Sequence, residues 1–284
     1  MQKLYLTSEC MEQFGDFLKE RENTQATVEK YQRDVKAFLR YLGGERVVTK
    51  EILNRYKEWL LEHYAVSSVN SMITAVNQFL VSLHGEELKI RRVRVQREFF
   101  RSASRELNQE DYKKILDIAQ RKGKEQLTMI LQTICETGIR ISELQYFTVE
   151  QVKRGRIEIL NKGKYRVILL PEGLRSKLLA YIGKCRIKEG YVFCTKSGNK
   201  KDRSNLWREM KALSREAGVQ QDKMYPHNLR HLFARNFYKE TGNLSNLANL
   251  LGHTSLEVTR VYTMESMEEC EKMLNWVNRR TAIL

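Results

Sequence analysis

The chain has 284 residues, a formal net charge of +15 at pH 7 and a pI near 9.6. This length suffices for two domains with separate cores, and the charge favours a polyanionic partner, above all nucleic acid, because neutralising phosphates releases counterions. An anionic membrane surface would attract the same charge, but no apolar stretch approaches the roughly 20 residues that span a bilayer, and the first residues lack a secretory signal. The five cysteines are scattered and never form a CxxC pair, so we expect a cytoplasmic protein without a disulfide framework or a zinc site.

Residues 1–88 are predicted to form a small helical domain. The stretches 28–42 and 69–83 repeat apolar residues with the helical period, and two glycines interrupt the first of them. Shorter patterns around Phe14 and Tyr56 bring the expected number of helices between residues 8 and 83 to four. The domain shows no nucleophile beside a base in helical register, so we do not expect catalysis there.

Residues 89–105 form a predicted basic linker, in which seven lysines and arginines face one acid, Glu98. A charge run of this kind is usually a solvated connection. In a chain this basic, a linker that crosses a nucleic-acid backbone is at least as well supported. The residues predicted to make such contacts are Lys89, Arg91, Arg92, Arg94, Arg97 and Arg101.

Residues 106–284 begin with two predicted amphipathic helices. Asn108 has the side chain of a helix N-cap, and the second helix ends where Thr137-Gly138 interrupts the apolar pattern. Arg140 then falls at the start of a further helix, together with Ser142 and Glu143.

A small sheet is predicted next. Two strand-like runs, Arg156–Leu160 and Tyr165–Leu170, are joined by Asn161-Lys162-Gly163-Lys164, which indicates a hairpin with a cationic tip. A helix over 174–181, a short strand over 191–194 and a helix around Leu206 follow. The expected fold class is therefore mainly α with a small antiparallel sheet (α+β).

The segment YPHNLRH (225–231) predicts another helix, because Pro226 suits a first helical position. His227 and Arg230 are three residues apart and share a helix face. His227 and His231 have the spacing of a helical zinc pair, but Asn228 stands where a metalloprotease helix has a carboxylate. We therefore predict no metal site.

A junction between two helices is predicted near the end of the chain. Gly252 ends one helix in a left-handed turn, His253 follows, and Thr254 and Glu257 have the spacing of a capping box. Tyr262 then falls about two turns into the second helix. Taken alone, such a histidine and tyrosine are more often a polar turn and a packed aromatic than a site.

Six dispersed polar residues together match the needs of one reaction at a phosphodiester. Two guanidiniums can grip its non-bridging oxygens and stabilise a pentacoordinate transition state, and histidines can contact the same oxygens or accept a proton. A phenol assisted by cations can attack phosphorus, and a lysine can protonate the departing sugar oxygen. No metal or nucleotide cofactor is needed, because a phosphotyrosine bond conserves the energy for resealing. The six residues are Arg140, Lys162, His227, Arg230, His253 and Tyr262.

The motifs that carry these residues resemble those of the tyrosine recombinase (phage integrase) family, which includes Xer-type site-specific recombinases. TGIRISEL (137–144) resembles the first arginine box, NKGK (161–164) the lysine hairpin, HNLR (227–230) the H-x-x-R box and LGHTSLEVTRVYT (251–263) the last box. The resemblance implies that Arg140 and Arg230 are the catalytic arginines, Lys162 the general acid, His227 the base, His253 a phosphate contact and Tyr262 the nucleophile.

The same resemblance implies a domain organisation and a partner. Residues 1–88 would be a SAM-like core-binding domain, 89–105 a linker and 106–284 a catalytic domain with a C-terminal docking helix, and the domains would form a C-shaped clamp around double-stranded DNA. Cleavage at specific recombination sites would leave a 3′-phosphotyrosine and a free 5′-hydroxyl. Strand exchange would take place at the nucleoid in a synapse of four protomers, all copies of this chain or including a related recombinase.

Several alternatives remain open on the sequence alone. Asn161 stands where many relatives have glycine, so either Lys162 or Lys164 could be the general acid. Type IB topoisomerase-like relaxation shares much of the chemistry, and a non-catalytic DNA-binding protein could retain the same scaffold. Integration or excision of a mobile element, inversion and dimer resolution would all use one active site.

Overall fold

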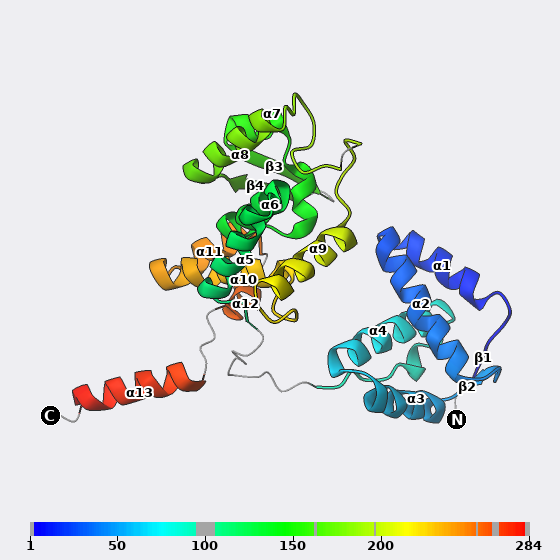
Figure 1. Ribbon diagram of the computed structural model, residues 1–284. Helices are drawn as coiled ribbons and strands as arrows, with labels where there is room; N and C mark the ends of the chain where they lie inside the picture. Colours follow the sequence, from blue (N-terminus) through cyan, green and yellow to red (C-terminus); the bar gives the residue numbers. More distant parts are fainter. Residues whose placement is uncertain are drawn as a thin grey trace. The chain divides into compact units, whose positions relative to one another are not determined.

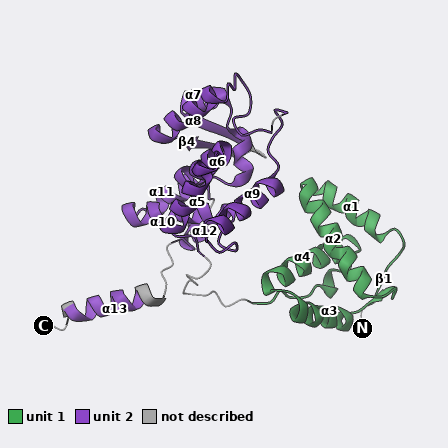
Figure 2. Ribbon diagram, in the orientation of Figure 1, with its two compact units in different colours: residues 1–97 green, residues 98–284 purple. Residues whose placement is uncertain are grey.

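The computed structural model describes residues 3–94, 106–161, 164–195, 197–253, 255–262 and 267–281 (Figure 1). It divides into two compact units, residues 1–97 and 98–284 (Figure 2). Helices dominate both units and each unit has one two-stranded antiparallel sheet, which confirms the predicted fold class. No helix in the described part of the chain is both long and apolar enough to cross a membrane. The domain boundaries proposed at residues 88 and 106 stay predictions, since residues 95–105 lie outside the description.

The first unit contains the four predicted helices and a short strand pair. Thr24 and Thr49 cap two of the helices, because their hydroxyls accept the N–H groups of Thr27 and Ile52. The elements of this unit are β1 (Leu4–Tyr5), α1 (Cys10–Glu20), α2 (Gln25–Tyr41), β2 (Val47–Val48), α3 (Lys50–His63), α4 (Val66–Ser82) and the 3-10 helix η1 (Glu86–Leu88).

The apolar face of each helix in this unit packs into one core. Phe14, Phe38, Tyr56 and Phe79 are fully buried, and the rings of Phe14 and Phe79 meet edge to face at 5.4 Å. Aromatic pairs of this geometry add to the free energy gained by burial. The helical periodicity of the sequence therefore located this core correctly.

The first residues of the predicted basic linker lie against α4. Asn77 donates to the carbonyl of Ile90 at 2.8 Å and accepts its N–H at 3.0 Å, and Asn70 makes the same pair of bonds with Val93 at 3.0 and 2.7 Å. The buried side chain of Ile90 fastens the same segment to the core. Arg91 and Arg92 are consequently held at the surface of the unit with their side chains exposed.

The second unit consists of helices around a β-hairpin. Strand β3 pairs with β4 in antiparallel register, so Ile157 lies opposite Ile168, and Ile159 lies opposite Arg166. The elements of this unit are α5 (Gln109–Arg121), α6 (Glu125–Thr137), the 3-10 helix η3 (Ile141–Tyr146), α7 (Val149–Arg154), β3 (Arg156–Asn161), β4 (Lys164–Leu169), α8 (Glu172–Lys184), α9 (Arg203–Glu216), α10 (Pro226–Thr241), α11 (Leu244–Leu251), α12 (Leu256–Arg260) and α13 (Met267–Thr281).

Two local predictions in this unit are wrong. The short strand expected over 191–194 is not formed; Tyr191 and Cys194 make only isolated bridges, with Thr148 and Lys200, because no second residue pair extends either ladder. The last short helix begins at Leu256 with Ser255 as its N-cap, whose hydroxyl accepts the N–H of Glu257 at 3.2 Å. The helix therefore starts one residue later than a capping box at Thr254 requires, and Thr254 itself lies outside the described residues.

Candidate active site

Arg140 is placed by the abrupt end of α6. Gly138 closes that helix with φ +64°, and a Cβ at this position would lie 2.3 Å from the Phe233 ring, so only glycine fits. Arg140 is the N-cap residue of η3, where Glu143 accepts its backbone N–H at 2.7 Å and its guanidinium at 3.3 Å. The Arg140 side chain remains 44% exposed, so it is available to a ligand.

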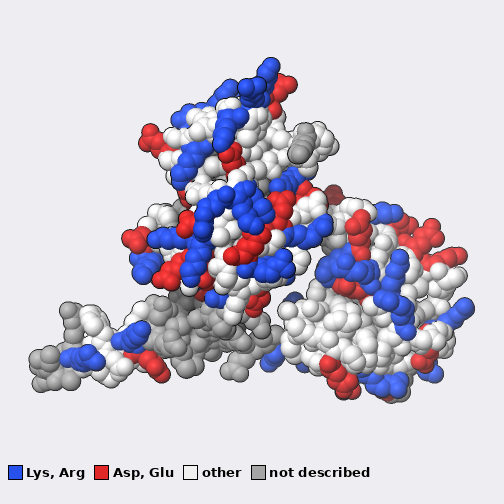
Figure 3. Space-filling view, in the orientation of Figure 1, with Lys and Arg blue, Asp and Glu red and all other residues white. Residues whose placement is uncertain are grey.

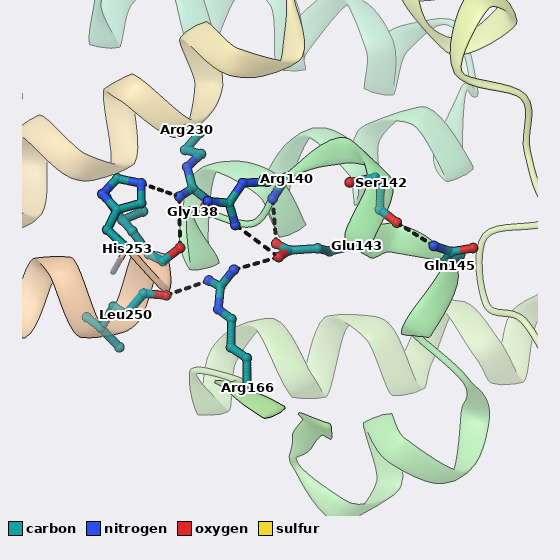
Figure 4. Close-up of polar contacts among 10 residues, drawn as sticks. Gly138, Arg140, Ser142, Glu143, Gln145, Arg166, Arg230, Leu250 and His253 are labelled. Carbon is teal, nitrogen blue, oxygen red and sulfur yellow. Dashed lines mark hydrogen bonds and ion pairs between the residues drawn. The ribbon is translucent and has the colours of Figure 1, made fainter. Parts of the chain in front are cut away.

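Arg230 on α10 is only 1% exposed and joins three parts of the site (Figure 4). Its guanidinium donates to the carbonyl of Gly138 at 2.7 Å, to the carbonyl of Leu251 at 2.8 Å and to Nε2 of His253 at 2.8 Å. The two carbonyls belong to the C-terminal ends of α6 and α11, where acceptors lack helical partners and the helix dipole is negative. The buried charge is thus compensated by two helix ends rather than by a carboxylate.

His253 follows the left-handed Gly252 that ends α11. Its Nε2 must accept from Arg230, because a guanidinium only donates. In the neutral ring the proton therefore resides on Nδ1, which donates to the hydroxyl of Thr259 at 2.9 Å. Thr259 is fully buried in α12, so the helix junction fixes the orientation of the imidazole.

Tyr262 lies just after α12, not two turns inside a helix as predicted. The helix stops at Arg260, and the N–H of Tyr262 donates to the carbonyl of Thr259 at 2.9 Å. The phenol ring is 5% exposed and packs with Leu247 and Leu251 in a small apolar cluster. It stacks on the His253 ring at 5.9 Å and meets the His231 ring edge-on at 4.7 Å.

A pocket of about 850 Å³ opens beside these residues. Arg140, His227 and Arg230 line it, so the structure brings the two predicted arginines and the first predicted histidine to one cavity. Lys162 lies outside the described residues, and the choice between Lys162 and Lys164 stays a prediction. The opposite wall comes from α9 and was missed in the sequence; its residues are Arg203, Ser204, Trp207 and Arg208.

Burial and the surrounding positive charge keep His253 and His227 neutral at pH 7. Burial, followed by repulsion from Arg230, Arg140 and Arg166, lowers the pKa of His253 to about 4. Burial, followed by repulsion from Arg230 and Arg140, also lowers the pKa of His227. The pKa of Arg230 falls to about 10, chiefly through burial and then through Arg140, while a hydrogen bond with Tyr262 raises it. Both histidines can therefore act as proton acceptors at neutral pH.

Three further residues of the site were not identified as functional in the sequence. Glu143 was noted only as a neighbour of Arg140, yet its carboxylate binds the guanidiniums of both Arg140 and Arg166. Arg166 occupies a position on the inward face of β4, two residues before the buried Ile168. An arginine at an inward strand position is the one signal that could have indicated a buried ion pair. His231 had been considered only as a metal ligand, whereas its ring contacts those of His227 and Tyr262.

The depressed pKa of His253 predicts a pH dependence of stability. The unfolded chain protonates this histidine near its ordinary value of 6.5 and the folded chain only near 4, so the unfolded state binds more protons between these values. The stabilisation is complete above pH 6.5 and is lost as the pH falls toward 4. The free energy of unfolding of the wild type, measured with denaturant, should therefore fall more steeply with decreasing pH than that of His253→Gln.

His63→Gln is the matched control, since His63 is an exposed histidine at the end of α3. This variant should retain the wild-type pH slope. Equal slopes for the wild type and His253→Gln would contradict the assignment of a buried neutral imidazole.

Comparison with known proteins accounts for both units. The phage integrase family matches residues 105–269, and the N-terminal SAM-like domain of phage integrases matches residues 11–87. The tyrosine recombinase XerA of Pyrococcus furiosus is 24% identical over 287 residues, covering 98% of this chain and 97% of the relative.

Two solved structures share the fold. One is the XerH site-specific recombinase bound to a palindromic difH substrate in a post-cleavage complex, with a TM-score of 0.70, 21% identity and coverage of 91% of this chain and 82% of that chain. The other is a lambda integrase tetramer bound to a Holliday junction, with a TM-score of 0.72, 16% identity and coverage of 91% and 77%. The matched family covers more than half of the sequence, and the chain belongs to the phage integrase family of tyrosine recombinases.

Proposed function

We propose that Tyr262 attacks a DNA phosphodiester held by Arg140, Arg230 and His253, and that the chain thereby cleaves and rejoins DNA at specific recombination sites. One observation carries the assignment of residues. The Arg230 guanidinium contacts His253 and Tyr262 while also lining the pocket that contains Arg140 and His227. A phosphate in that pocket would meet the guanidiniums of Arg140 and Arg230, and Arg230 would connect it to His253 and Tyr262, which do not line the pocket themselves.

The proposed step is a transesterification that balances without a cofactor. The phenol oxygen of Tyr262 forms a bond to phosphorus, the bond from phosphorus to the 5′-oxygen breaks, and a 3′-phosphotyrosine results. The phenol proton passes to His227, whose lowered pKa leaves it neutral and able to accept it. The 5′-oxygen takes a proton from Lys162, or from Lys164, and religation runs the same sequence in reverse.

Phosphate binding would also change the hydrogen bonds of the free chain. The Nη2 atom of Arg230 now donates to His253, and a phosphate oxygen would compete for that donor. A bound anion also favours the protonated imidazole. His253 would then turn from an acceptor of Arg230 into a donor to the phosphate.

Replacing Tyr262 by phenylalanine tests this proposal directly. The variant keeps the packed ring but lacks the nucleophile, so we expect it to retain no DNA under denaturing conditions, whereas the wild type retains fragments of the genomic DNA of the encoding organism. Tyr238→Phe is the matched control, because Tyr238 packs against the same apolar cluster. Mass spectrometry should locate the wild-type adduct on Tyr262, and sequencing the retained DNA identifies the site. Equal retention by Tyr262→Phe, or no retention by the wild type, would refute the proposal.

We further propose that the basic segment starting at Lys89 contacts the DNA backbone. Lys89, Arg91, Arg92 and Arg94 are exposed on the first unit, while Arg97 and Arg101 lie outside the described residues. Basic side chains also spread over the face of each unit seen in Figure 3, among fewer acidic ones. Contacts from both units would place the two domains on one duplex, as in the clamp expected from the sequence. A protein that binds chromosomal DNA in this way would be located in the cytoplasm, at the nucleoid.

The salt dependence of duplex binding distinguishes phosphate contacts made by this segment from the general effect of the protein's positive charge. Arg91→Gln with Arg92→Gln should reduce the slope of log Kd against log salt by about one for each lost phosphate contact. Lys113→Gln with Lys114→Gln removes the same charge from an adjacent exposed pair on α5 and should leave the slope nearly unchanged. Equal slopes for both double variants would exclude a specific backbone contact by the basic segment.

We also propose that α13 docks on a neighbouring protomer within a tetramer on DNA. Met273 and Leu274 on this helix are 50% and 65% exposed. Changing both to serine should reduce assembly of two cognate duplexes into one complex on native gels, while Tyr262 still cleaves a single duplex. Serine at Glu271 and Lys272, two exposed polar positions of the same helix, is the control. Normal assembly of the Met273 and Leu274 variant would exclude this docking surface.

A further inference from the structure

Arg166 links three elements around the pocket without lining it. This arginine lies on β4, and its side chain is 13% exposed. Its guanidinium donates to Oε1 of Glu143 at 2.6 Å and to the carbonyl of Leu250 at 2.5 Å (Figure 4). The partners are 23 and 84 residues away in the sequence, so this contact connects η3 and α11 through the β-hairpin.

The first of these contacts supports Arg140. Glu143 has a side chain only 10% exposed, and its two oxygens accept the backbone N–H and the guanidinium of Arg140. Arg166 binds the same carboxylate more closely than the Arg140 guanidinium does, at 2.6 against 3.3 Å. A carboxylate buried to this extent needs a second fixed donor to keep one orientation.

The second contact supports His253. Leu250 and Leu251 present consecutive carbonyls at the end of α11, of which Arg166 binds the first and Arg230 the second. A Cβ on Gly252 would lie 2.7 Å from Cδ of Arg166, and the φ of this glycine is +64°. The stem of Arg166 therefore shapes the turn from which His253 emerges.

We propose that Arg166 is a positioning residue for DNA cleavage: by holding Glu143 and the end of α11 together, it fixes Arg140 relative to His253. The proposal rests on the proposed function, since it assumes that a phosphodiester is bound between these two residues. Arg166 itself does not touch the substrate, because both terminal nitrogens of its guanidinium are bonded within the protein. Lysine cannot replace it, since a single ammonium lacks the rigid fork that reaches two acceptors.

Single-turnover cleavage by Arg166 variants tests this role. The probe is a nicked suicide duplex that carries the sequence recovered from wild-type complexes on Tyr262. Arg166→Met should bind this duplex normally but cleave it slower by on the order of 100-fold, the effect of a small misplacement of reacting groups. Arg166→Lys retains the positive charge and should also cleave slowly. If Arg166→Met does not fold, the cleavage rate of Arg166→Lys tests the proposal instead.

Arg235→Met is a matched control for the loss of a buried arginine. Arg235 on α10 also joins a carboxylate, that of Glu106, to a backbone carbonyl, that of Leu107, and none of the three lines the pocket. This variant should cleave at the wild-type rate at temperatures where it is folded. If Arg235→Met lost as much cleavage as Arg166→Met, the loss of any arginine contact of this kind would impair cleavage. That result would overturn the proposal.

A methylphosphonate at the cleaved position separates positioning from a purely structural role. It replaces one charged non-bridging oxygen by a methyl group, and so removes charge that Arg140 would neutralise. If Arg166 acts through Arg140, the defect of Arg166→Lys should shrink on at least one of the two diastereomers. The positioning role of Arg166 is overturned if Arg166→Lys shows the same defect on the phosphate substrate and on both diastereomers. It is also overturned if Arg166→Lys cleaves the phosphate substrate at the wild-type rate, and neither result contradicts the proposed function. A wild type that never forms the Tyr262 adduct overturns the proposed function and this proposal with it.

Discussion

The site depends on one buried guanidinium that is stabilised by the ends of two helices. Arg230 is almost fully buried, yet its hydrogen bonds go to the final carbonyls of α6 and α11 and to a neutral imidazole. Carbonyls at a helix end carry partial negative charge and lack partners of their own, so they stabilise a cation without cancelling it. A carboxylate in the same place would have formed a closed ion pair. Arg230 therefore keeps its attraction for an anionic ligand while remaining rigidly held.

The charge balance of the surrounding site follows from this arrangement. The guanidiniums of Arg140 and Arg166 share the carboxylate of Glu143, and Arg230 lies beside Arg140 (Figure 4). Burial, and after it the surplus positive charge, depresses the pKa of His253 and His227, so these residues do not add to that charge at neutral pH. The positive charge of the pocket can thus stabilise a phosphate whose negative charge grows in the transition state, and the neutral histidines can still accept a proton.

Much of the fold and most of the site were predictable because the relevant signals are local. Helical periodicity located the four helices of the first unit, Asn108 caps α5 as predicted, and Pro226 opens α10. Glycines with positive φ mark the ends of α6 and α11, so Arg140 and His253 could be assigned to helix junctions from sequence alone. The sequence analysis assigned the capping box to Thr254, but the N-cap is the adjacent and chemically similar Ser255.

The parts that the sequence did not predict depend on contacts between distant segments. The role of Arg166 requires the hairpin, η3 and the end of α11 to meet, and no spacing within one element encodes that meeting. The pocket wall from α9 likewise forms only after α9 packs against α5 and α6. Tyr262 was expected inside the helix predicted from the capping box at Thr254 and Glu257, but that helix ends at Arg260. The side chains of Val258 and Val261 are about half exposed, at 54% and 46%, so little apolar packing extends the helix further.

In the proposed mechanism Tyr262 has both a structural and a chemical role, and this combination constrains how the nucleophile reaches the phosphate. Its ring contributes to the apolar cluster of Leu247 and Leu251, while its hydroxyl lies beside the guanidinium of Arg230, which lines the pocket. A nucleophile held by packing loses little conformational freedom when it attacks, which lowers the entropic part of the barrier. Two packing partners of Tyr262, Leu247 and Leu251, belong to α11, whose end is bound by both Arg166 and Arg230. The end of α11 therefore helps to position both the imidazole of His253 and the phenol of Tyr262, so the proposed phosphate contact and the proposed nucleophile are positioned together.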